Sequence, residues 1–221
     1  MFRKCLAEAI GTYAIVFAGT GAIVVNDLSG GAITHPGIAI VFGLVVMSQI
    51  YALGKISGAH LNPAVTLSLS AARVFPAREI PAYITAQLVG AVAASATLHL
   101  LFPEHKGLGA TLPAGGAMQS FVLEFLLTLG LVLVILCAAV RPAPHPALAG
   151  VAIGGVIGLE AMFAGPICGA SMNPARSIGP ALLSGNTTAL WIYIAAPVLG
   201  ALSAVPIWRI LVPDTESASA G

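Results

Sequence analysis

Two stretches of sequence decide the fold: "SGAHLNPAVT" at residues 57–66 and "GASMNPARS" at residues 169–177. Asparagine is a preferred N-cap and proline is favoured at the first helical position, so Asn-Pro-Ala predicts the start of a helix. The tripeptide occurs once in each stretch, as Asn62, Pro63 and Ala64 and as Asn173, Pro174 and Ala175.

The apolar stretches that these tripeptides begin, residues 62–72 and 173–184, are shorter than the roughly 20 residues that cross a bilayer. Each follows a glycine-containing run, "ISGAHL" or "ICGASM". Irregular backbone at membrane depth is tolerated only where protein buries it or where it lines a watery cavity. We therefore expect two re-entrant half-helices, each preceded by a loop whose carbonyls line a cavity; the residues concerned are Gly58, Ala59, His60, Gly169 and Ala170.

The composition is that of a membrane protein. The chain has 221 residues, 58% of them apolar and 8% charged, and its mean hydropathy is +0.98. Soluble domains carry about 25% charged residues, so we predict an all-α integral membrane protein. The net charge of +1 gives no reason to propose a nucleic-acid partner. The first apolar run is too long for a cleavable signal peptide. Hydropathy predicts six spans, near 5–25, 37–54, 81–101, 119–140, 147–164 and 189–211.

The basic residues predict the orientation, because cytoplasmic loops carry an excess of lysine and arginine. If the N-terminus is cytoplasmic, Lys106 and Arg176 lie on the other side. An even number of spans then places both termini in the cytoplasm, and the absence of long tails suggests a bacterial inner membrane. The basic residues on the cytoplasmic side would be Arg3, Lys4, Lys55, Arg73, Arg78, Arg141 and Arg209.

The chain is an internal repeat. "GIAIVFGLVV" from Gly37 resembles "GVAIGGVIGL" from Gly150, and "QLVGAVAA" from Gln87 resembles "PVLGALSA" from Pro197. We place the repeats at about 1–106 and 117–213 within one channel domain, with a short polar tail at 214–221. Three spans in each repeat is an odd number, so the second repeat must insert upside down. Inverted repeats place a shared pathway near the midplane, with half-helix N-termini pointing at it.

The asparagine pair, Asn62 and Asn173, predicts what this pathway favours. A capping asparagine accepts helix N–H groups with its oxygen and keeps N–H donors for another partner. Two such caps, with two half-helix dipoles, would hold a water molecule by its oxygen and disfavour cations and protons. Arg176 follows only the second tripeptide and would add a fixed positive charge at the extracellular mouth. A purely structural arginine that donates to loop carbonyls is the alternative, and the two roles can coexist.

Three carboxylates and one histidine remain to be placed. Glu8 and Glu124 lie at matching repeat positions, so support of the two loops is favoured over a proton relay. Glu160 has no such counterpart, and either a helix junction or the pathway entrance would suit it. His60 is interpreted as a structural donor, because no second metal ligand stands nearby. The three cysteines show neither metal nor disulfide spacing, so no metal or cofactor is expected.

The paired motifs, the six spans and the repeat resemble the major intrinsic protein family, the aquaporins and glycerol facilitators. "GPICGASMNPARSIGPA" and "GKISGAHLNPAVT" are most similar to the nodulin-26-like branch and its bacterial relatives. The resemblance implies a bundle of six helices and two half-helices, assembled as a homotetramer with one pore per subunit. It also implies passive flow of water or small uncharged solutes.

The resemblance further implies a four-residue selectivity filter, here called the filter: Phe42, Ala161, Ala170 and Arg176. Water-selective members carry histidine at the position of Ala161, and glycerol facilitators carry a Trp and Phe pair, so this chain departs from both. Two alanines predict a wide pore for water, glycerol, urea and neutral metalloid hydroxides such as arsenite. A strictly water-selective channel, a proton-coupled transporter and, least favoured, a membrane enzyme are the alternatives.

Overall fold

The computed structural model describes residues 1–140 and 145–212. Within these ranges the protein is all-α, and six of its helices are long and apolar enough to cross a membrane. This confirms the predicted fold class. The long helices are α1 (Phe2–Leu28), α2 (Thr34–Ser57), α4 (Ile80–Leu101), α5 (Ala117–Ala139), α6 (Ala149–Cys168) and α8 (Leu190–Leu211). The short ones are α3 (Pro63–Ala71), α7 (Pro174–Ser184) and the 3₁₀ turns η1 (Ala77–Glu79) and η2 (Pro146–Leu148).

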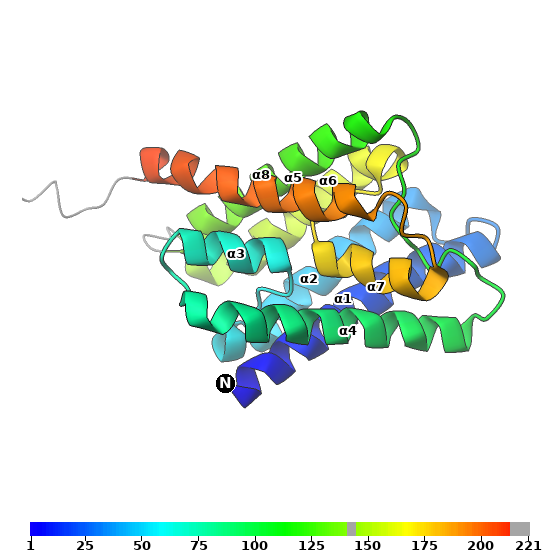
Figure 1. Ribbon diagram of the computed structural model, residues 1–221, viewed down its shortest axis with the longest axis horizontal. Helices are drawn as coiled ribbons and strands as arrows, with labels where there is room; N and C mark the ends of the chain where they lie inside the picture. The colour runs from blue at the N-terminus through cyan, green and yellow to red at the C-terminus, as the bar shows by residue number, and fades with distance from the viewer. Residues whose placement is uncertain (141–144, 213–221) are drawn as a thin grey trace, which may run out of the picture.

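The two half-helices lie in opposite halves of the bundle. Figure 1 shows α3 in one half of the molecule and α7 in the other, with their first residues near the middle. Each half-helix packs against the last long helix of the opposite repeat, α3 against α8 and α7 against α4. The repeats therefore interlock, and neither half-helix is held by its own repeat alone.

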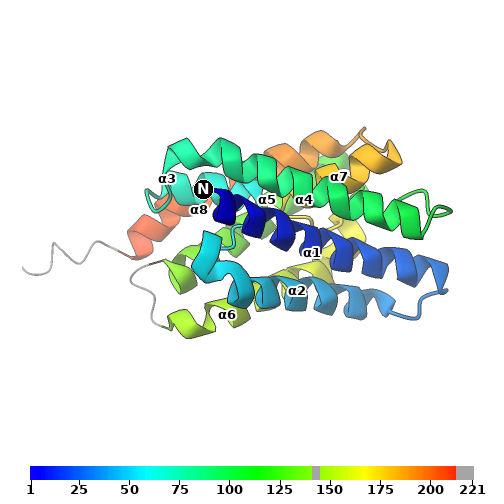
Figure 2. The same ribbon diagram turned by 90° about the horizontal axis from the view of Figure 1, so that it is seen from below.

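The long helices pack in the same way in both repeats. Helix α1 contacts α2 and α4, as Figure 2 shows, and α5 contacts α6 and α8 in the matching arrangement. Helices α2 and α6 join the repeats, and they approach closely because both carry glycine at the crossing. A Cβ atom added at Gly43 would lie 2.6 Å from the carbonyl oxygen of Gly154. Small residues allow such backbone approach inside membranes.

Five of the long helices are longer than the hydropathy windows predicted, because those windows report only the hydrocarbon core, whereas α8 is one residue shorter. The largest difference at a single helix end is at α6, which was expected to end near residue 164 and instead continues through Pro166 to Cys168. Proline lacks the N–H that would bond to the carbonyl four residues earlier, here that of Met162. His35 Nε2 lies 2.6 Å from that carbonyl oxygen and takes the place of the missing donor.

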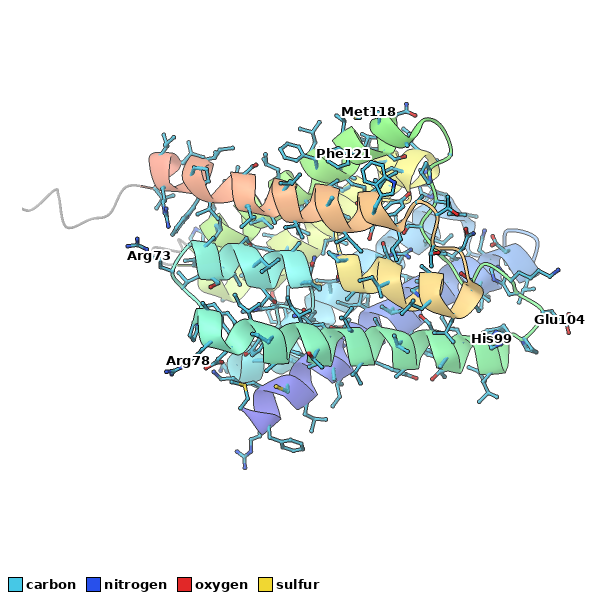
Figure 3. All side chains as sticks on the ribbon, in the orientation of Figure 1. Arg73, Arg78, His99, Glu104, Met118 and Phe121 are labelled. Carbon is cyan, nitrogen blue, oxygen red and sulfur yellow. The ribbon has the colours of Figure 1, made fainter. Side chains whose placement is uncertain are left out.

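The basic residues gather at one end of the bundle. Figure 3 places Arg73 and Arg78 at the end where Figure 1 shows the N-terminus and the last turns of α8, while His99 and Glu104 lie at the opposite end. At the basic end, Arg209 donates to the carbonyl oxygen of Ala71, the last residue of α3, at 2.9 Å. Arg141 and the predicted tail at 214–221 lie outside the described residues.

Candidate functional site

A cavity of about 690 Å³ runs through the middle of the bundle. It reaches from Arg176 to Ala72 and Trp208 at the basic end. All four filter residues and both members of the asparagine pair line it. Of the loop residues expected there, Gly58, Ala59, His60 and Ala170 also line it. Gly169 is not among its lining residues, because it is the residue that ends α6 and packs toward Thr111.

The two loops that lead into the half-helices have the same unusual backbone. Gly58 and Gly169 end α2 and α6 in the left-handed region, with φ of 90° and 85°. The non-glycine residues that follow also have positive φ, which costs about 1–2 kcal/mol for each. These are Ala59 (48°) and Leu61 (53°) in the first loop, and Ala170 (41°) and Met172 (53°) in the second. Such a backbone persists only where its surroundings hold it in place.

Two buried carboxylates hold these loops. Glu124 on α5 accepts the N–H of Ser171 at 2.7 Å and that of Met172 at 2.8 Å. Glu8 on α1 accepts the N–H of His60 at 2.9 Å and that of Leu61 at 2.7 Å. Both carboxylates are fully buried, so the bonds are formed away from water. This arrangement fits loop support, and it uses the oxygens that a proton relay would need.

Several supporting residues had not been singled out from the sequence. Tyr83 donates to the carbonyl oxygen of Ser57 at 2.7 Å, and Tyr193 donates to that of Cys168 at 2.8 Å. The internal repeat could have revealed these tyrosines, because Tyr83 and Tyr193 are separated by the same number of residues as Gln87 and Pro197. Gln87 itself donates to Glu8 Oε2 at 2.8 Å. That bond has no equivalent in the second repeat, where the residue is proline.

The asparagine pair caps both half-helices and links the two loops. Asn62 Oδ1 accepts the N–H of Ala64 at 2.9 Å, and Asn173 Oδ1 accepts that of Ala175 at 3.0 Å. Asn62 Nδ2 donates to the carbonyl oxygen of Met172 at 2.7 Å, and Asn173 Nδ2 donates to that of Leu61 at 2.9 Å. Each amide has two hydrogens. Each asparagine therefore keeps one N–H for a molecule in the cavity. An asparagine that only capped its helix would keep both.

Arg176 lies in the first turn of α7 and is 2% exposed. Its Nη1 donates to the carbonyl oxygen of Gly109 at 2.8 Å, while its Nε has no protein partner within the described residues. The guanidinium carbon lies 5.0 Å from the centre of the Phe42 ring, within the range of a cation–π contact. The Phe42 ring therefore lies beside the guanidinium, and both side chains line the cavity.

Glu160 and His60 lie in separate surroundings. Glu160 lies at the junction of α6 with α5, where a Cβ atom added at Gly130 would be 2.9 Å from its Oε1. It does not line the cavity. His60 Nδ1 lies 3.1 Å from Thr66 Oγ1, and its ring packs against those of Phe75 and Tyr83. The part of the chain that the structure describes has no group of three or more His, Cys, Asp or Glu side chains that could hold a metal ion.

Comparison with known proteins places this site in a family. The model of the major intrinsic protein family matches residues 1–208. Aquaporin NIP1-1 of Oryza sativa subsp. japonica is 49% identical over 210 residues, which cover 95% of this chain and 74% of that protein. Nodulin-26 of Glycine max is 46% identical over 95% of this chain and 78% of that protein. The X-ray structure of the aquaglyceroporin from Plasmodium falciparum superimposes with a TM-score of 0.87 at 27% identity, covering 96% of this chain and 97% of that one. The chain therefore belongs to the major intrinsic protein family of membrane channels.

Proposed function

We propose that the protein is a passive channel for water and small uncharged solutes, and that the filter sets which solutes pass. The observation that carries the proposal is the continuous cavity that joins the filter to the asparagine pair. Nodulin-26-like proteins of plants and an aquaglyceroporin are among the proteins similar to this chain, which supports solutes larger than water.

The filter is wide because two of its four side chains are methyl groups, those of Ala161 and Ala170. Phe42 supplies an apolar wall, and Arg176 supplies the donors that its bond to Gly109 leaves unused. A solute with several hydroxyl or amide groups would bond to Arg176 and to loop carbonyls while its apolar side passes Phe42. Glycerol, urea and neutral metalloid hydroxides such as arsenous or boric acid fit this description.

Exclusion of ions would follow from positive potential at two points. The N-termini of α3 and α7 carry partial positive charge, and the asparagine pair adds one free N–H from each side. Arg176 adds a full charge at the filter. Water and other neutral oxygen donors can be held there, whereas a cation or a hydronium ion would be repelled.

A strictly water-selective pore is the main alternative, and it would need bulk that Ala161 and Ala170 do not provide. A proton-coupled transporter is less favoured, because Glu8 and Glu124 already accept bonds from the loops. Of the other buried carboxylates in the described residues, Glu79 pairs with Lys4 at 2.9 Å, and Glu160 stands outside the cavity. We assign no catalytic residue, metal or cofactor.

We also propose that residues 1–221 form one channel domain with repeats at about 1–106 and 117–213, and that four copies assemble with one pore each. Both termini would be cytoplasmic, at the end where Arg73, Arg78 and Arg209 lie. The protein is an integral membrane protein. The aquaporin NIP1-1 and nodulin-26 reported above are plant proteins, which do not fit the expected bacterial inner membrane, so we no longer propose that location.

The filter is tested by Ala161→His in proteoliposomes, with water, glycerol and arsenite fluxes measured side by side. A histidine here adds bulk and a second donor, so glycerol and arsenite fluxes should fall much more than water flux. Met162→His is the matched control, since it adds the same side chain one residue along α6 on the outer surface. Equal loss of all three fluxes, or the same loss in the control, would contradict the assigned role. Saturating flux that depends on a proton gradient would instead favour a coupled transporter.

A further inference from the structure

The segment between α4 and α5, residues 102–116, supplies the carbonyl that holds Arg176. That carbonyl belongs to Gly109, whose φ is +69°. A Cβ atom added at Gly109 would lie 2.7 Å from the Cβ of Thr20 on α1, so this position is packed tightly against that helix. The direction of the Gly109 carbonyl therefore depends on how the residues just before it are fixed.

His105 fixes those residues at the end of the bundle opposite the N-terminus. Its Nε2 lies 3.1 Å from Oδ2 of Asp27, near the end of α1. Its Nδ1 accepts the N–H of Leu108 at 2.9 Å. Leu108 is 1% exposed, has a φ of 48° and directly precedes Gly109. His105 thus connects the end of α1 to the residue next to the carbonyl that holds Arg176.

This geometry requires a neutral imidazole. A backbone N–H can only donate, so Nδ1 of His105 must carry a lone pair and Nε2 must carry the hydrogen that faces Asp27. Protonation at Nδ1 would remove the acceptor for Leu108 and would strengthen the attraction to Asp27. Histidine is the side chain that ordinarily changes charge between about pH 5 and 8.

Few other charges face this ring. Asp27 is the charged group that α1 presents to it, and Glu104 and Lys106 flank it in its own segment with exposed side chains. Arg176 on α7 is linked to it only through Gly109. Asp27 and His105 have side chains that are 53% and 12% exposed, so the pair is accessible to protons from the adjacent solution.

We propose that the Asp27–His105 pair positions the Gly109 carbonyl and, through it, the guanidinium of Arg176, so that the solute preference of the filter responds to pH on the extracellular side. With neutral His105 the carbonyl holds Arg176 in place for hydroxylated solutes. With protonated His105 residues 105–109 lose one internal bond, Arg176 is less well positioned, and glycerol passes less readily relative to water. The inference rests on the proposed function of the filter.

The change is local, because other contacts keep the rest of the segment in place. Thr111 Oγ1 donates to Ser177 Oγ at 2.8 Å, and the N–H of Ala114 donates to the carbonyl oxygen of Ile167 at 3.0 Å. Neither contact involves His105. The expected effect is therefore that of one hydrogen bond, which corresponds to roughly a two- to tenfold change in the ratio of glycerol to water permeability.

The test uses the full chain in proteoliposomes buffered equally on both sides, at a series of pH values from 8 to 5. The ratio of glycerol to water permeability is measured for the unmodified protein, His105→Asn, His105→Gln and Asp27→Asn. His99→Gln is the matched control, because His99 is an exposed histidine at the same end of the bundle (Figure 3). Protein-free vesicles provide the background.

Each variant has a distinct expectation. His105→Asn keeps an oxygen that can accept the N–H of Leu108 but does not titrate, so the ratio should stay high at every pH. His105→Gln reaches Asp27 but not Leu108, so the ratio should stay low. Asp27→Asn keeps an amide oxygen that can accept from Nε2 of His105, so the ratio at pH 8 should match that of the unmodified protein. His99→Gln should behave as the unmodified protein.

A ratio that does not change between pH 8 and 5 in the unmodified protein would overturn the inference. So would a pH dependence that survives in His105→Asn. If the unmodified protein carries water but excludes glycerol at every pH, the proposed function itself is wrong. If glycerol passes equally well at every pH, only the inference about His105 is wrong and the proposed function stands.

Discussion

The most demanding structural prediction concerns Glu124→Gln. Glutamine replaces one carboxylate oxygen by an NH2 group, so the N–H of either Ser171 or Met172 loses its acceptor and faces another donor. Glu124 is fully buried, so the N–H that loses its bond lies away from solvent. Leaving one buried N–H without an acceptor costs about 1–3 kcal/mol. For a chain of this size, each kcal/mol lowers the unfolding temperature by roughly 2–4 °C.

Glu8→Gln should be milder, because its surroundings can adapt. Glu8 also accepts the hydroxyl of Ser57 at 2.7 Å and the amide of Gln87 at 2.8 Å. The Ser57 hydroxyl can turn to accept from the new NH2 group, and the buried Gln87 Oε1, which has no partner within the described residues, offers a second acceptor. One backbone N–H is still left without its bond, but a new bond forms beside it.

Both variants are to be heated in detergent, and the folded fraction is measured by size-exclusion chromatography. Glu124→Gln should lower the midpoint by roughly 2–12 °C, following the free energies above. Glu8→Gln should lower it by less. Glu104→Gln is the control, since that exposed carboxylate should shift the midpoint very little. An unchanged midpoint for Glu124→Gln, or a larger loss for Glu8→Gln, would refute the assignment of the loop-supporting role.

Three further predictions follow from single contacts. Asn173→Ala removes a helix cap worth about 1 kcal/mol and the free N–H in the cavity, so water flux should fall in protein that still folds; normal flux would contradict the role given to the asparagine pair. Arg176→Val should leave uncharged solutes passing and weaken the exclusion of protons, measured with a pH-sensitive dye inside the vesicles; background proton flux would mean that the asparagine pair suffices. His35→Phe should lower the unfolding temperature by a few degrees, because Pro166 leaves the carbonyl of Met162 without another donor; an unchanged midpoint would show that this carbonyl does not need His35.

The helices could be predicted because each rests on a local signal. Apolar length gave the six spans, and Asn-Pro pairs gave the starts of α3 and α7 at the residues observed. The repeat could also predict that Glu8 and Glu124 have one shared role. The end of α6 could not be predicted, because the proline in its last turn is compensated by His35, which contacts the carbonyl of Met162 from 127 positions away in the chain.

The contacts of the segment 102–116 could not be predicted from the sequence for a different reason. Gly109 and His105 lie in an irregular stretch without periodicity, and their partners Arg176 and Asp27 are 67 and 78 residues away. Glu160 has no repeat counterpart, so nothing in the sequence chose between the helix junction and the cavity. Loop contacts of this kind depend on how the whole bundle closes, which no local pattern records.

The central claim is that two alanines make the filter wide enough for solutes larger than water. The most direct measurement is the permeability of the unmodified protein, in proteoliposomes, to water, glycerol and arsenite, each imposed as a simple concentration gradient. We predict that all three cross at rates well above those of protein-free vesicles, in proportion to the gradient and without saturation. Water flux with glycerol and arsenite at background would contradict the wide filter.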